Sequence, residues 1–178
     1  MRSIFIYSIL LLFFSSTSNA QLGITGQEGL LVDGKTNMYI APSTLLHIDG
    51  NLFIKKSQGP LWVRNNGTIS LTGNLTCNDP LICEQSSKTS PTSTFIFQPK
   101  LPIVSISGTT DSIVFYHTII NKPNTIVKIN SGTNIKVLDT LDLQAGSIQL
   151  AGGNINFMPA IGSPSYINHP YLKNENNQ

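Results

Sequence analysis

Short alternating segments of apolar and polar residues follow one another through most of the chain. They are rich in Ile, Val, Thr and Leu and are separated by Gly, Asn, Asp and Ser, which is the pattern of half-buried β-strands joined by turns. No window keeps the i, i+3, i+4, i+7 spacing of an amphipathic helix over three turns. The alternation predicts strands at 45–48, 51–54, 61–63, 68–71, 94–97, 112–120, 125–129, 134–138, 140–143, 147–150 and 154–157.

A repeated sequence motif distinguishes between the β-solenoid and the β-sandwich, the two all-β architectures that fit this list. Residues 46–52 (LHIDGNL) recur 23 residues later at 69–75 (ISLTGNL), and residues 148–155 (IQLAGGNI) form a third copy with one extra residue. A period of this size is typical of solenoids. The apolar positions would stack inside, and Gly-Asn would turn the corner. We therefore predict an all-β, single-stranded parallel β-helix (β-solenoid), with a β-sandwich as the alternative.

Two segments depart from the repeat. The polar run SSKTSPTS, together with the cysteines that precede it, predicts a loop excursion over about 77–102. Residues 163–178 are polar and predict a disordered tail or a truncated continuation. The solenoid domain is therefore expected over 21–162.

The first twenty residues have the order of a secretory signal peptide. Arg2 precedes an apolar run at 4–14, and small residues lead to Ala20. The run of 11 residues is shorter than the roughly 20 that a membrane-spanning helix needs. We expect cleavage between Ala20 and Gln21, secretion or an outer-surface location, and no membrane span in the mature chain.

Charge and cysteine content limit the kinds of partner and of covalent cross-link that we expect. Loss of Arg2 leaves the basic and acidic residues nearly balanced and scattered, so nucleic acid is not an expected partner. Cys77 and Cys83 flank the turn-forming run Asn-Asp-Pro, which in an exported chain predicts a disulfide that closes a small loop. Such a bond would stabilise the fold by about 2 kcal/mol. No metal site or cofactor is predicted.

A longer phrase occupies residues 104–150. Ile106 and Gly108 open it, Phe115 and residues 119–121 (IIN) form its middle, and residues 137–150, beginning VLDTLDL, close it. This phrase resembles the amino-terminal β-solenoid regions of large secreted proteins of Bacteroidota. The resemblance covers roughly 30–165 and implies an adhesin-like surface protein exported by the type IX route. The sorting domain with which such proteins end is not recognised here, so one hypothesis is a truncated fragment of a larger surface protein.

Candidate chemistry is sparse, because no catalytic motif is recognisable in the sequence. Trp62 and Tyr116 are candidates for carbohydrate contact, and strand alternation predicts that Tyr116 is exposed opposite a buried Phe115. Asp139 and Asp142 are expected on opposite faces of one strand, which does not suit paired acid–base catalysis. Asp49 is expected to be a solvated corner residue.

Two triplets resemble the Asp-Ser/Thr-apolar sites of O-glycosylation in Bacteroidota, and they make Ser112 and Thr140 candidates for modification. The leading functional hypothesis is a non-enzymatic secreted or surface-exposed β-solenoid that acts as a structural or adhesive scaffold. The alternative is a carbohydrate-binding or polysaccharide-degrading β-helix. The expected partners are extracellular polysaccharide or cell-surface components.

Overall fold

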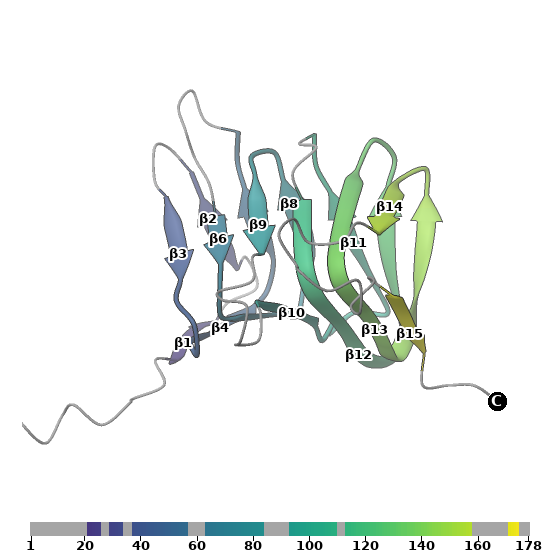
Figure 1. The fold of residues 1–178 in the computed structure, drawn as a ribbon, viewed down its shortest axis with the longest axis horizontal. Helices are drawn as coiled ribbons and strands as arrows, with labels where there is room; N and C mark the ends of the chain where they lie inside the picture. The colour runs from purple at the N-terminus through teal and green to yellow at the C-terminus, as the bar shows by residue number, and fades with distance from the viewer. Residues whose placement is uncertain are drawn as a thin grey trace, which may run out of the picture.

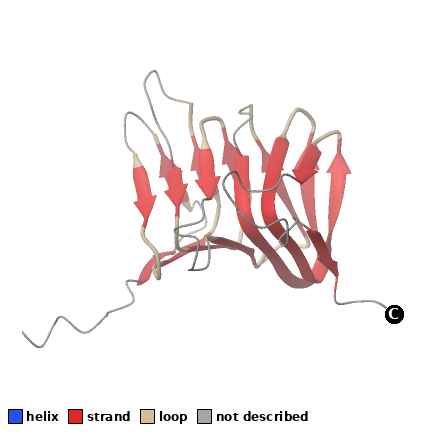
Figure 2. Cartoon of the chain, in the orientation of Figure 1, coloured by secondary structure: helices blue, strands red, loops and turns tan. Residues whose placement is uncertain are grey.

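The computed structural model describes residues 21–25, 29–33, 37–56, 63–83, 93–109, 113–157 and 171–174. The described residues form strands and turns without a helix, and every strand pair between named elements is parallel. Stacked turns of chain make a β-solenoid of about five turns, which advances along the longest axis of the molecule (Figures 1 and 2). The predicted fold class is confirmed.

Three ladders of parallel strands form the three sides of the solenoid, and we call them A, B and C. Ladder A joins β1 (Gln21–Thr25), β4 (Leu45–Asp49), β7 (Thr68–Leu71), β10 (Thr94–Phe97) and β15 (Tyr171–Asn174) with the middle of β12 and β13. Ladder B joins β2 (Leu30–Val32), β5 (Leu52–Ile54), β8 (Leu75–Cys77) and β11 (Ile103–Ser107) with the ends of β12 and β13. Ladder C joins β3 (Met38–Ile40), β6 (Val63–Asn65), β9 (Leu81–Cys83) and β14 (Asn154–Phe157) with the starts of β12 (Ile113–Asn130) and β13 (Asn134–Ala151).

The register of the ladders agrees with the first two copies of the sequence repeat. Leu46 pairs with Ile69 in ladder A, and Leu52 pairs with Leu75 in ladder B. The third copy occupies a different corner, because Ile148 lies in ladder B and the strand that follows belongs to ladder C. A strand, a glycine turn and another strand form a local unit, so the same phrase can turn more than one corner.

Inward-facing residues from the three ladders form one continuous apolar core. In the turns around β4 and β7 the core is aliphatic, with Ile48, Ile69 and Leu71 fully buried. In the next turns Phe95 packs against Phe97 and Phe115 with ring centroids 4.8 Å and 5.0 Å away. These separations suit favourable aromatic pairing.

The strands are longer and more numerous than alternation predicted. The predicted strands at 112–120 and 125–129 are parts of β12, and those at 134–138, 140–143 and 147–150 are parts of β13. Several strands of three residues were not predicted, since a pattern of period two is hardly visible over so short a stretch.

The predicted excursion over about 77–102 contributes strands to the body of the solenoid. Its described parts include β9 in ladder C and β10 in ladder A, and residues 84–92 lie outside the described residues. Within the predicted disordered tail, β15 pairs with β13, with Thr140 opposite Tyr171. The edge of β13 that faces away from β12 has backbone N–H and C=O groups available for pairing, and β15 pairs with them. The predicted signal peptide and the remainder of the tail lie outside the described residues.

Candidate binding site at the corner between ladders A and B

The corner between ladders A and B differs between turns of the solenoid. From β4 to β5 the chain turns through Gly50-Asn51, and from β7 to β8 it turns through Thr72-Gly73-Asn74. From β10 to β11 it follows the longer segment 98–102, which contains two prolines. A hollow of about 600 Å³ lies at this place, and we call it the corner cleft; it is lined by Asp49, Gly50, Asn51, Thr72, Gly73, Asn74, Lys100 and Leu101.

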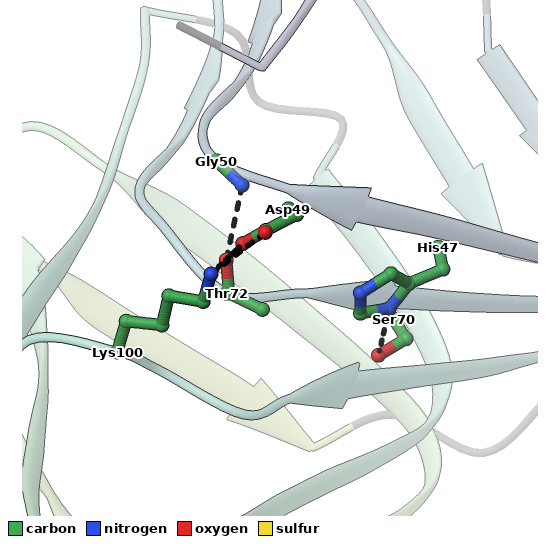
Figure 3. A network of polar contacts seen from close by, with 6 residues as sticks. All are labelled: His47, Asp49, Gly50, Ser70, Thr72 and Lys100. Carbon is green, nitrogen blue, oxygen red and sulfur yellow. Dashed lines mark hydrogen bonds and ion pairs between the residues drawn. The ribbon is translucent and has the colours of Figure 1, made fainter. Parts of the chain in front are cut away.

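A polar network joins three successive turns at the corner cleft (Figure 3). The Lys100 ammonium lies 2.6 Å from the Asp49 carboxylate, and the Thr72 hydroxyl donates to Asp49 Oδ1 at 3.0 Å. The Gly50 N–H donates to the same Thr72 oxygen at 3.0 Å. The Lys100 backbone N–H donates to the Thr72 carbonyl at 3.0 Å, which places the lysine over the preceding turn.

The network lowers the pKa of Asp49. The hydrogen bonds from Lys100 and Thr72 both favour the charged carboxylate, and they outweigh the smaller opposing effect of desolvation. Asp49 is therefore ionised at neutral pH and held against a cation. The expected solvated corner aspartate is 28% exposed at its side chain, and it has defined partners.

Asparagine side chains form a second row of cross-turn contacts in the same cleft. Asn51 Oδ1 accepts from the backbone N–H of Asn74 at 2.8 Å and from its Nδ2 at 3.1 Å. Asn74 Oδ1 in turn accepts from the Ser105 backbone N–H at 2.8 Å. The predicted role of Gly-Asn as a corner unit is confirmed in these two turns, and the asparagine also joins each turn to the next.

His47 and Ser70 lie beside the cleft on neighbouring strands (Figure 3). His47 Nδ1 is 3.2 Å from Ser70 Oγ, and this hydroxyl donates to Gln98 Oε1 at 3.4 Å. The Ser70 proton is directed to Gln98 and not to the imidazole, whereas an activated serine nucleophile donates to its histidine. The two contacts join side chains from three successive turns of the solenoid.

The prediction that Tyr116 is exposed is wrong, since it is 6% exposed and belongs to the core. The register between β12 and β13 shifts between Phe115 and His117, which breaks the alternation and turns both aromatic residues inward. Burial, assisted by the negative charge of Asp139, raises the pKa of the Tyr116 phenol. A ring in this position does not offer a face to a sugar.

The other predicted site residues do not meet in one place. Trp62 and Ser112 lie outside the described residues, as does Ala20, while Gln21 begins β1. Thr140 is 5% exposed and its hydroxyl donates to Asp139 at 3.0 Å, so it is not accessible for glycosylation in the folded chain. Asp142 accepts from Gln144 at 3.0 Å, so the two carboxylates have different partners.

The Cys77–Cys83 disulfide stays a prediction. Cys77 is fully buried at the end of β8, and Cys83 ends β9 on the next side of the solenoid. No disulfide is found among the side chains that the structure describes, and the Cys83 side chain lies outside them.

A second hollow of about 470 Å³ lies at the same corner further along the solenoid. It is lined by Pro123, Asn124, Thr125, Ile126, Ala145, Gly146 and Ser147. No group of three or more His, Cys, Asp or Glu side chains in the described ranges could hold a metal ion. In the same ranges no helix is long and apolar enough to cross a membrane.

Sequence reasoning did not single out Lys100 and Leu101. The signal that could have identified them is the run Gln-Pro-Lys-Leu-Pro between two strands, where the two preceding corners, at 50–51 and 72–74, need only two and three residues. Comparisons with known proteins give no match: no protein-family model, no curated protein and no solved structure is significantly similar to this chain.

Proposed function

We propose that this chain is a non-enzymatic, secreted or surface-exposed β-solenoid that serves as a structural and adhesive scaffold. The observation that carries the proposal is the polar network that joins three successive turns through Asp49, Thr72 and Lys100. Each turn of a solenoid contacts its neighbours, so such cross-turn contacts make an elongated body stiff. A stiff body with polar side chains at regular intervals suits contact with an extended surface.

The signal-like amino terminus of the sequence supports an extracellular location. The resemblance to adhesin-like surface proteins of Bacteroidota supports the same role. Attachment by the type IX route belongs to this proposal as one means of reaching the cell surface.

The second candidate is carbohydrate recognition, and the corner cleft favours binding over cleavage. A glycosidic bond is broken with a carboxylic acid whose pKa is raised, so that it can donate a proton. Asp49 has the opposite character, because its pKa is lowered by Lys100 and Thr72. Glycan hydrolysis by this carboxyl group is therefore not part of the proposal.

Two measurements on residues 21–178 test the scaffold proposal. The purified chain is incubated with a panel of plant, fungal and bacterial polysaccharides, and released reducing ends are assayed. Antibodies against the chain are applied to intact and to permeabilised cells of the native host. We expect no product and labelling of intact cells or of the medium. Release of oligosaccharides, or labelling confined to permeabilised cells, would overturn the proposal.

A further inference from the structure

We infer that the corner cleft binds an uncharged carbohydrate, with sugar hydroxyls contacting Asp49 and Lys100 and the C–H face of the ring packed on Leu101. The inference rests on the proposed function, since an extracellular scaffold meets polysaccharide. It goes beyond that function by assigning the binding place and the class of ligand.

The size and lining of the cleft suit a small polar ligand. Its volume of about 600 Å³ falls within the range of small-molecule sites. Polar groups from three turns converge there, and the inserted segment 98–102 supplies one wall. Sites of this kind have a few placed polar groups that fix the orientation of the ligand.

The charges in the cleft favour a neutral ligand that both donates and accepts hydrogen bonds. Asp49 and Lys100 neutralise each other at 2.6 Å, so an anion would compete with the carboxylate and a cation with the ammonium. Each charged group keeps hydrogen-bonding capacity, because an ammonium has three donors and a carboxylate has about four acceptor positions. Their side chains are 66% and 28% exposed. Adjacent hydroxyl groups, as in a sugar, meet both requirements.

Leu101 and Asn51 supply two further groups that a sugar would contact, an apolar surface and an amide donor. The Leu101 side chain is 59% exposed although it is apolar, and it lines the cleft beside the ion pair. It offers a surface for the C–H groups of a sugar ring, which would otherwise face water. Both hydrogen bonds of the Asn51 side chain use Oδ1, so within the described part of the chain its Nδ2 donors are available to a ligand.

The second hollow indicates a chain-like ligand. It lies at the corner between ladders A and B, further along the solenoid, where β12 and β13 pass from one ladder to the other. Exposed Ile103 is paired with Ile126, which lines that hollow, so an apolar strip begins where the corner cleft ends. An oligosaccharide, whose rings have an apolar face and a hydroxylated rim, can follow such an edge.

The test is titration of ¹⁵N-labelled residues 21–178 with cellohexaose, xylohexaose, mannohexaose and maltohexaose, followed by amide chemical shifts. Polygalacturonate serves as the anionic comparison. We expect at least one neutral oligosaccharide to shift the amides of 49–51, 72–74 and 100–101, with a weaker response to polygalacturonate. No shift with any of the four, shifts confined to other parts of the surface, or a stronger response to the anionic polymer would overturn the inference.

Variants sharpen the result. Lys100→Met and Leu101→Ser should each weaken the binding, the first by about tenfold through loss of a charge-assisted hydrogen bond. Lys55→Met is the matched control, because Lys55 forms a similar ion pair with Asp33 at 2.9 Å outside the cleft. Equal affinities of the Lys100→Met and Lys55→Met proteins, with unfolding midpoints like that of the wild type, would contradict the assignment.

The same samples separate the two proposals. Reducing ends released from a bound oligosaccharide would overturn the non-enzymatic scaffold while leaving the binding place intact. Absence of both binding and release would overturn the carbohydrate site and leave the scaffold proposal standing.

Discussion

The turns that contain β4 to β9 and the turns that begin at β10 share the same three ladders but are held together in different ways. In the earlier turns the corner between ladders A and B is short, and backbones and asparagine side chains approach closely. From β10 to β11 the corner is long, and the core beside it contains three packed phenylalanine rings. The comparison shows that a solenoid can lengthen one corner and place larger side chains in its core while its strands keep their pairing.

The largest expected effect is in the aromatic core of the later turns. Phe95→Ala should lower the free energy of unfolding by about 3–5 kcal/mol, because it removes a fully buried ring that contacts two others. Ile69 occupies the paired position in the preceding turn, and Ile69→Val should cost only about 1 kcal/mol. Denaturant unfolding followed by circular dichroism measures both. A loss for Phe95→Ala no larger than that for Ile69→Val would contradict the tight packing of the three rings.

The short corner is tested by Gly73→Ala. A Cβ at this position would lie 2.4 Å from the Gly50 carbonyl oxygen, so neighbouring turns would have to move apart. We expect a loss of about 3 kcal/mol in unfolding free energy. Gly23→Ala in β1 is the control, since a Cβ there meets nothing within 4 Å. A Gly73→Ala protein as stable as the control would show that close approach does not matter at this corner.

The asparagine row is expected to contribute less. Asn74→Ala removes the hydrogen bonds to Asn51 and from Ser105 and should lower the unfolding free energy by about 1–2 kcal/mol. Asn156 is exposed in β14, and Asn156→Ala should change stability by less than about 0.5 kcal/mol. Thermal unfolding of the two variants measures the difference. Equal changes in stability would show that the asparagine row does not stabilise the contact between turns.

The smallest effect concerns the ion pair that connects the two regions. Because the pKa of Asp49 is lowered from its ordinary value of 3.8, its contribution to stability is present above pH 3.8 and is lost as the pH falls through the lowered value. Wild type should therefore be more stable than Asp49→Asn at neutral pH, and the difference should vanish in acid. Urea midpoints measured between neutral and strongly acidic pH test this. A difference that does not depend on pH would contradict it.

The architecture could be predicted from the sequence because each copy of the repeat consists of a few consecutive residues. The phrase shared by 46–52 and 69–75 places Leu46 over Ile69 and a Gly-Asn pair at each corner, and the structure confirms both. The third copy shows where the inference ends, since the same local phrase at 148–155 turns another corner.

The candidate site was less accessible to sequence reasoning. The cleft depends on Lys100 reaching back to Asp49 across two turns, a contact that no periodic pattern contains. The burial of Tyr116 depends on a shift in register between strands, which alternation along one strand cannot reveal. Both features arise where the chain departs from its repeat.

The long corner at 98–102 has a consequence for how such a surface can change. After it, Ile106 pairs with Leu75 and Ser107 with Thr76 of the preceding turn, whose corner is shorter, so the extra residues leave ladder B in place. Sequence at a corner can thus vary in length and chemistry while the walls retain their pairing. Evolution, or a designer who grafts a foreign loop, could exchange the ligand preference of this edge without redesigning the body that presents it.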